Sequence, residues 1–271
     1  DNFVETWPTE KREPKARTEG YITFDQDNLY VVFICYDPDM SKLRANLSDR
    51  DRMFQDDFVG INIDPYGTKQ TSFEFFVNAR GIQGDLVQQS SSGNEDETFD
   101  AVWESDAKIY SDHWTVEMRL PFKSLRFPNT PTQDWLIHIW RIFPRESRYL
   151  YSWMPVSQNN NSLFSQAGHL KMEKSMTSGK NIEVLPYVLG SKANELVSAT
   201  DSTGKWRGPR NRTNAGFNLK YGIASNLTLD LAYNPDFSQI ESDAGQVNVN
   251  NTFALYYREK RPFFLEGSDI F

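Results

Sequence analysis

Carboxylates are the side chains best able to do chemistry in this sequence, and several stand in close groups. These groups are Asp37/Asp39, Asp49/Asp51, Asp56/Asp57 and the run Asn94–Glu97. Calcium takes about 6–8 oxygen ligands from carboxylates and carbonyls, so each group could contribute to a cation site. None has the fixed spacing of an EF-hand loop, and solvated surface charge is the alternative. Structural calcium is therefore a candidate cofactor, with its ligands unknown.

Motifs of enzyme active sites are absent from the sequence. It contains neither a Gly-x-Ser-x-Gly nucleophile elbow nor a phosphate-cradling Gly-x-x-x-x-Gly-Lys loop. The histidines, His113, His138 and His169, are too widely spaced to form a metal-binding pair. A glycosidase needs two carboxylates across a cleft, and their separation cannot be derived from sequence. We predict a binding module without catalytic residues, and keep a hydrolase of O-glycosyl bonds, or its accessory domain, as the alternative.

Aromatic rings and amides offer a second kind of chemistry, the binding of sugars. The C–H face of a pyranose packs on a ring, while hydrogen bonds to its hydroxyls set its orientation. Trp153 follows an exposed-looking turn, and the loop Gln158–Ser162 supplies several amides, although an ordinary polar turn would look the same. The other tryptophans in strand-like segments are expected to pack in the core: Trp103, Trp114, Trp135 and Trp140.

Bulk composition limits the partners. The 271 residues carry a formal net charge of -8, which argues against a nucleic-acid partner. The single cysteine, Cys35, lies in an apolar run and is expected to be a buried thiol. No stretch approaches the ~18 consecutive apolar residues of a transmembrane helix. The N-terminus lacks a charged-then-apolar leader, so we expect either no export or a leader already removed.

Short strands must position these groups. Trp114–Leu120 alternates apolar and polar residues, which indicates a strand with one buried face. Gln88–Thr98 is polar and is predicted to be an exposed loop, and no convincing amphipathic helix is found. Many closely spaced strands predict an all-β fold, a jelly-roll-like β-sandwich with immunoglobulin-like layers. The remaining strands are expected at Gly20–Phe24, Leu29–Tyr36, Phe58–Asp64, Thr71–Asn78, Ala101–Trp103, Ala107–Tyr110, Asp134–Phe143 and Tyr149–Met154.

The pattern changes after Met172–Lys180, which has the composition of a linker. Asn181–Leu189, Thr213–Tyr221 and Asn226–Tyr233 are strand-like and weakly alternating. Strands of transmembrane barrels have ~9–11 residues with such alternation. We therefore expect a sandwich domain over residues 1–174 and a second region of antiparallel strands over residues 181–271. That region is either the opening of a barrel or an addition to the edge of the sandwich.

A set of short motifs follows in order over residues 1–172: Asp27–Val31, Tyr36–Pro38, Gln55–Val59, Ile63–Pro65, Phe76–Asn78, Trp114–Glu117, Leu120–Phe122 and Gly168–Leu170. With these motifs in this order, the first domain resembles the family 9 carbohydrate-binding modules. Each motif is weak alone, but their order is fairly specific. In these modules the sugar lies between two aromatic faces and polar groups bind its hydroxyls.

The resemblance implies a set of sugar-binding residues. The first aromatic position falls on Phe54, and the second falls on Leu163 with Phe164 beside it; polar positions fall on Asn78 and Asn160. With Trp153, the predicted carbohydrate-binding residues are Phe54, Asn78, Trp153, Asn160 and Phe164.

Two departures and two further expectations come with the resemblance. Gly60 stands where these modules usually have a glutamate, and Phe76 where they usually have an arginine, so two hydroxyl partners are missing. Related modules carry structural calcium. Other relatives bind haem through methionine and histidine or lysine, which makes Met53 with His138 or His169 a remote alternative.

The C-terminal part contains a second set of distinctive motifs: Leu219–Gly222, Asn226–Asp230, Asn234–Phe237, Gln239–Asp243 and Arg258–Gly267. With these motifs it resembles a bacterial envelope family that joins this type of module to an outer-membrane β-barrel. Members of that family are often labelled membrane-associated hydrolases, although no catalytic residues come with that label. The resemblance implies a non-catalytic glycan-capture or scaffold module in the outer membrane or periplasm, with an oligosaccharide or polysaccharide as partner.

Overall fold

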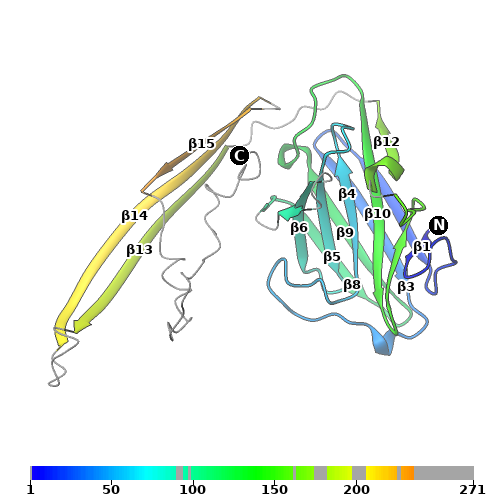
Figure 1. Cartoon of the computed structure of the whole chain (residues 1–271), viewed down its shortest axis with the longest axis horizontal. Coiled ribbons are helices and arrows are strands. Elements are labelled where there is room, and N and C mark those ends of the chain that lie inside the picture. Colours follow the sequence, from blue (N-terminus) through cyan, green and yellow to red (C-terminus); the bar gives the residue numbers. More distant parts are fainter. Residues whose placement is uncertain are drawn as a thin grey trace. The chain divides into compact units, whose positions relative to one another are not determined.

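The chain divides into two compact units, residues 1–179 and residues 180–271. The computed structural model describes residues 2–89, 94–96, 99–160, 163–173, 182–196, 206–224 and 227–234. Within these residues every regular element is a β-strand or a short 3-10 helix (Figure 1). The prediction of an all-β fold is therefore confirmed.

Among the described residues, no helix is long and apolar enough to cross a membrane.

The first unit is a sandwich of two antiparallel sheets (Figure 1). The larger sheet has the order β1-β11-β10-β4-β5-β6-β7, and β12 pairs with the first half of β10. Its strands are β1 (Val4–Trp7), β4 (Phe58–Asp64), β5 (Thr71–Asn78), β6 (Gln83–Gln89), β7 (Asn94–Asp96), β10 (Gln133–Pro144), β11 (Arg148–Ser152) and β12 (Gly168–Met172).

The smaller sheet has the order β2-β3-β9-β8. Its strands are β2 (Thr18–Phe24), β3 (Asn28–Tyr36), β8 (Glu104–Ile109) and β9 (His113–Pro121). The connections contain three 3-10 helices: η1 (Met40–Lys42), η2 (Phe122–Ser124) and η3 (Leu163–Gln166).

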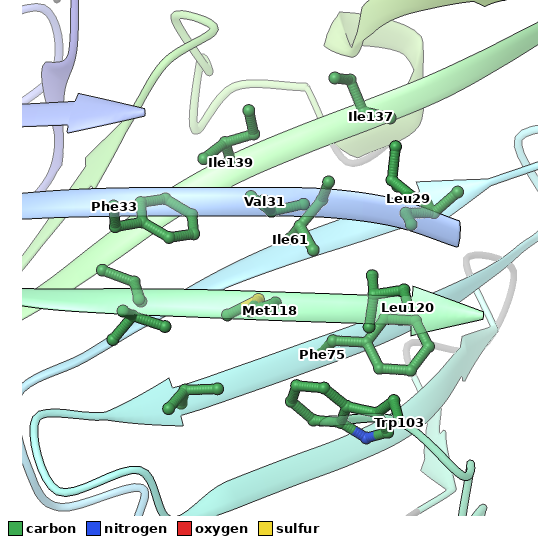
Figure 2. Close-up of a cluster of buried hydrophobic side chains, with 14 of the residues drawn as sticks. Leu29, Val31, Phe33, Ile61, Phe75, Trp103, Met118, Leu120, Ile137 and Ile139 are labelled. Carbon is green, nitrogen blue, oxygen red and sulfur yellow. The ribbon is translucent and has the colours of Figure 1, made fainter. Parts of the chain in front are cut away.

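The main core lies between the two sheets. Along β3, alternate residues from Leu29 to Cys35 are buried and their neighbours are only partly buried, which is the period-two pattern of a strand with one covered face. β9 shows the same alternation, as its sequence predicts. Figure 2 shows side chains of both strands packed against residues of the larger sheet: Leu29, Val31, Phe33, Met118 and Leu120 face Ile61, Phe75, Ile137 and Ile139. The buried state of Cys35 is confirmed.

The strands differ from the prediction in several places. β1 and β6 are not among the predicted strands, and β8 begins at Glu104 where Ala107 was expected. Ala101–Trp103 is not a strand, because the N–H of Ala101 donates to the carboxylate of Asp85 (2.7 Å) and not to a neighbouring strand. Trp103 still packs in the core, where its ring meets Phe75 edge-on. The predicted loop Gln88–Thr98 contains a hairpin pairing, because β7 pairs with Val87–Gln89 of β6.

The second unit contains a three-stranded antiparallel sheet, β13-β14-β15. Its strands are β13 (Ile182–Leu196), β14 (Trp206–Ala224) and β15 (Leu227–Tyr233), of which the first two are longer than predicted. The motifs Gln239–Asp243 and Arg258–Gly267 lie outside the described residues.

Candidate functional site

The larger sheet has a second face, turned away from the main core, and this outer face carries the candidate site. Because side chains alternate along a strand, the even-numbered residues of β4, β5 and β10 share this face. The strand register aligns them in rows across the sheet. One row runs Trp140, Gly60, Phe76 and Gly84, and the next runs His138, Asn62, Glu74 and Leu86.

An aromatic cluster covers part of the outer face. Phe54, Phe58 and Phe76 meet edge to face, with ring centroids 5.5–5.8 Å apart, which is the geometry that aromatic quadrupoles favour. Met53 and Leu86 complete a small core that is separate from the main one. Beside it lies an open concavity of about 170 Å³, whose lining is apolar: Phe58, Phe76, Trp140, Ile142 and Leu150.

Gly60 and Phe76, the two departures from the sugar-binding pattern, form one structural unit. They are direct partners in the β4–β5 register, and the ring of Phe76 lies over Gly60. A Cβ at position 60 would collide with that ring. The absence of a side chain at position 60 therefore leaves room for the ring of Phe76, which lines the concavity.

A series of buried hydrogen bonds holds Trp140 in the lining of this concavity. The Trp140 Nε1–H donates to Asn62 Oδ1 (2.8 Å), and Asn62 Nδ2 donates to Glu74 Oε1 (2.5 Å). Ser72 Oγ is 3.4 Å from the same carboxyl oxygen. Burial raises the pKa of Glu74 to about 8, and the charge of Glu95 acts in the same direction. At neutral pH the Glu74 carboxyl group, the last member of this series of hydrogen bonds, is therefore uncharged.

His138 supports Trp140 from the other side. The two rings are stacked with centroids 5.3 Å apart, and Phe164 meets the imidazole edge-on. Nε2 of His138 is 2.9 Å from the carbonyl oxygen of Leu163, so Nε2 carries the proton and donates it. Burial lowers the pKa of His138, and its buried Nδ1 has no hydrogen-bond partner among the residues that the structure describes. The neutral imidazole thus tethers η3 to the sheet.

Two of the predicted binding residues, Phe54 and Phe164, lie on the outer face. Phe54 is half-buried in the aromatic cluster, next to the wall of the concavity. Phe164 is 1% exposed and its ring packs edge-on against the imidazole of His138. The ring is therefore not accessible to a ligand.

Asn78 also lies on the outer face, but its amide is fully engaged within the protein. Its Nδ2 donates to Asp56 Oδ2 (2.9 Å) and to the carbonyl of Asn46 (3.2 Å). Its Oδ1 accepts from the N–H groups of Arg80 and Ile82. The residue is completely buried, so the structure shows it shaping the turn after β5.

Trp153 packs against the main core and not in the aromatic cluster. It is half-buried and covers Gly168, where a Cβ would collide with its ring. Asn160 is exposed in the loop before η3, and its Nδ2 donates to Ser165 Oγ (2.8 Å). The structure therefore does not bring the five predicted residues together around one ligand.

The acidic pairs of the sequence separate in the fold. Asp37 and Asp57, from different pairs, both contact Arg145, whose side chain is 5% exposed. Asp56 turns away and accepts hydrogen bonds from Asn46 and Asn78. Adjacency in the chain therefore does not produce a shared ion site at Asp37/Asp39 or Asp56/Asp57.

A different acidic group comes together around Arg50. Oxygens of Asp51, Asp85 and Asp100 lie within 4.8 Å of one another. Arg50 contacts Asp85 (2.5 Å) and Asp100 (3.2 Å). A guanidinium so close already balances negative charge, which disfavours a divalent cation at the same place. Structural calcium therefore stays a prediction without assigned ligands.

The residues considered for haem have other contacts in the structure. Met53 is buried in the small core of the outer face, and His138 donates to Leu163 as described above. His169 is exposed on β12, with Nδ1 at 2.9 Å from Asp134. No axial pair is therefore assigned.

Sequence reasoning missed most of the concavity. It placed Trp140 in the core with the other tryptophans, yet Trp140 lies half-buried on the outer face. The period of β10 contains the missing signal: Trp135, Ile137 and Ile139 point to the main core, so Trp140, one residue further on, points away from it. Ile142 and Leu150 follow from the same alternation once β10 and β11 are paired.

Residues 2–139 match the model of the carbohydrate family 9 binding domain-like family, and this range is just over half of the 271 residues. The chain belongs to this family. Residues 153–271 match a second model, that of a domain of unknown function, DUF5916. No curated protein matches the chain.

Solved structures resemble the family 9 domain. A protein from Bacteroides uniformis, whose carbohydrate binding is itself a proposal, aligns with a TM-score of 0.50 at 12% identity, over 62% of this chain and 85% of the other. A family 9 module from Caldicellulosiruptor kristjanssonii, solved with glucose and with cellotriose, gives TM-scores of 0.44 and 0.45 at 14% identity. Those alignments cover 65% and 66% of this chain and 84% and 83% of the module. The Bacteroides likeness shows a shared fold.

Proposed function

We propose that the family 9 domain is a non-catalytic glycan-capture module, and that the concavity on its outer face holds one sugar ring. The observation that carries this proposal is the open apolar concavity walled by Phe58, Phe76 and Trp140. Aromatic surfaces of this kind pack against the C–H face of a pyranose. Its volume, about 170 Å³, suits a single ring and is small beside pockets for drug-sized ligands, which hold ~300–1,000 Å³.

Trp140 provides the most direct test of sugar capture. Replacing Trp140 with Ala should weaken binding about thirtyfold or more, because its ring is part of the lining of the concavity and truncation of a central aromatic typically costs ~2 kcal/mol or more of binding free energy. Binding of the full chain to a broad glycan array, followed by titration with the best ligand, measures the effect.

Tyr21→Ala is the control, because Tyr21 is an exposed aromatic residue (54%) on β2 of the smaller sheet, whereas the residues that line the concavity belong to the larger sheet. It should bind like the unchanged chain, and circular dichroism should show both variants folded. Equal losses from Trp140→Ala and Tyr21→Ala would show that the concavity is not the binding site. Turnover of a glycan by the unchanged chain would contradict the non-catalytic proposal.

We further propose that the C-terminal strands place the module at the outer membrane, as the first strands of a β-barrel. One face of the β13-β14-β15 sheet supports this, because it is continuously apolar and exposed or half-exposed. By strand register it consists of Ile182, Val184, Pro186, Val188, Ala215, Phe217, Leu219, Tyr221, Leu229, Leu231 and Tyr233. The opposite face is mixed and includes Asn214 and Asn218. Barrels that cross membranes alternate lipid-facing and lumen-facing residues in this manner.

Neighbouring positions on β13 test the membrane proposal. Val184 (57% exposed) and Leu185 (54% exposed) are apolar residues of similar exposure on opposite faces of the strand. Val184→Lys should lower the association of the full chain with phosphatidylcholine vesicles about thirtyfold or more, because a lysine on the lipid face costs ~2–4 kcal/mol at the bilayer midplane. Leu185→Lys should have little effect. Vesicle flotation measures both, and equal losses would contradict a single lipid-facing side.

A further inference from the structure

Arg148 stands at the rim of the concavity. On β11, Tyr149 and Tyr151 point to the main core, and Leu150, on the opposite side of the strand, lines the concavity. Arg148 shares the side of Leu150, and its guanidinium carbon lies 5.7 Å from the centroid of the Phe58 ring. A positive charge therefore lies against one of the aromatic walls.

This charge has no counter-ion within the part of the chain that the structure describes. Arg50, Arg119 and Arg145 each contact at least one carboxylate. Arg148 makes no ion pair with a described residue. The contact that the structure shows for its guanidinium is a cation–π contact with the Phe58 ring. Partial burial lowers its pKa, as expected when a cation loses water without gaining an anion. A ligand carboxylate would restore that lost stabilisation.

The apolar lining offers little else to orient a sugar. Four of its five side chains have no polar atom, and the fifth, Trp140, already donates its Nε1–H to Asn62. A neutral pyranose could pack there, but no lining side chain would bind its hydroxyls. The guanidinium of Arg148 can orient a sugar that carries a carboxylate, because a guanidinium binds a carboxylate through two parallel N–H···O bonds.

We propose that the concavity selects a hexuronic acid residue, with its C–H face on the aromatic lining and its carboxylate paired with Arg148. This inference rests on the proposed function, whose sugar class it names. The hydroxyls of the ring point to solvent, as an open concavity allows. Charge complementarity distinguishes this ligand from a neutral hexose of the same size.

Three matched ligands test the selection on the full 271-residue chain: methyl β-D-glucuronide, its methyl ester and methyl β-D-glucoside. Saturation-transfer NMR with titration measures their affinities. The glucuronide should bind about tenfold more tightly than the ester or the glucoside, which corresponds to one partly desolvated charge pair of ~1.4 kcal/mol. Added salt should reduce that preference.

Arg148→Gln should remove the preference while leaving the glucoside affinity within about twofold. Arg119→Gln is the control, because it removes the same charge from the other sheet, where Arg119 contacts Glu104, and it should keep the preference. A preference that survives Arg148→Gln would overturn the inference, as would equal binding of the three sugars. Equal binding would leave the proposed glycan capture intact.

A fourth probe separates failure of the inference from failure of the function. If no sugar on the array or in titration binds, both fail. If laurate binds in an Arg148-dependent manner while the sugars do not, the concavity takes an acyl carboxylate, and both proposals are wrong.

Discussion

Arg145→Met should destabilise the sandwich by about 3–5 kcal/mol, the cost of removing one partner from a buried ion pair. Arg145 contacts the carboxylates of both Asp37 and Asp57, whose side chains are fully buried. Burial raises the pKa of Asp57, and the hydrogen bond from Arg145 acts in the opposite direction. Methionine keeps most of the volume that packs over Phe143, so the loss would come from two carboxylates left without their cation.

Urea unfolding at pH 7, followed by tryptophan fluorescence, measures this loss. Arg119→Met is the control, because Arg119 and Glu104 form an exposed pair, and such pairs contribute ~0–1 kcal/mol. The double variant Arg145→Met/Asp57→Asn should recover part of the loss, since it removes one stranded charge. If Arg145→Met unfolds at the same urea concentration as Arg119→Met, the buried ion group is not a determinant of stability.

Glu74→Gln should make the protein more stable at alkaline pH, which is the second large effect. The pKa of Glu74 is about 8 in the fold, and a model carboxyl in the unfolded chain titrates near 4.3. Below the lower pKa, both states hold the proton and the two proteins should differ little. Between the two values the unfolded chain releases the proton while the fold retains it, so the unchanged protein loses stability as pH rises.

The difference between variant and unchanged protein should grow by ~1.4 kcal/mol per pH unit and reach about 3–5 kcal/mol near pH 8. Glutamine keeps the acceptor oxygen that Asn62 needs, so the hydrogen bonds that link residue 74 to Asn62 and Asn62 to Trp140 are kept. Unfolding curves at pH 5 and pH 8.5 measure the difference. Glu117→Gln, at an exposed position on β9, removes a charge without a burial cost and is the control. A pH-independent difference for Glu74→Gln would contradict the buried, protonated carboxyl.

Local sequence pattern was sufficient for the fold class and for the main core. The alternation of β3 and β9 is a property of a few neighbouring residues, because successive side chains on a strand point to opposite faces. Turn residues at Asp25–Asn28 and Pro65–Gly67 end the strands at positions that the sequence displays. Ordered motifs were sufficient for family 9 kinship, which the match over residues 2–139 confirms.

The candidate site needed the tertiary structure, because its residues meet only through long-range register. Gly60 and Phe76 look like two separate losses in the sequence, and only the β4–β5 pairing shows them as one packed unit. Trp140 looks like another core tryptophan until the start and face of β10 are known. A one-residue shift would turn every side chain of that strand to the other face, so composition alone cannot decide the question.

The pairing of charged groups also depends on the tertiary structure. The sequence by itself determined that carboxylates are abundant and that the chain is acidic. Only the fold decided which of them would face a cation: Asp37 and Asp57 reach Arg145 across 108 and 88 positions of chain, and Arg148 is left without a carboxylate at the rim of the concavity among the described residues. Electrostatic pairing depends on the distance between the charges and on their burial, and neither follows from which residues are adjacent in the sequence.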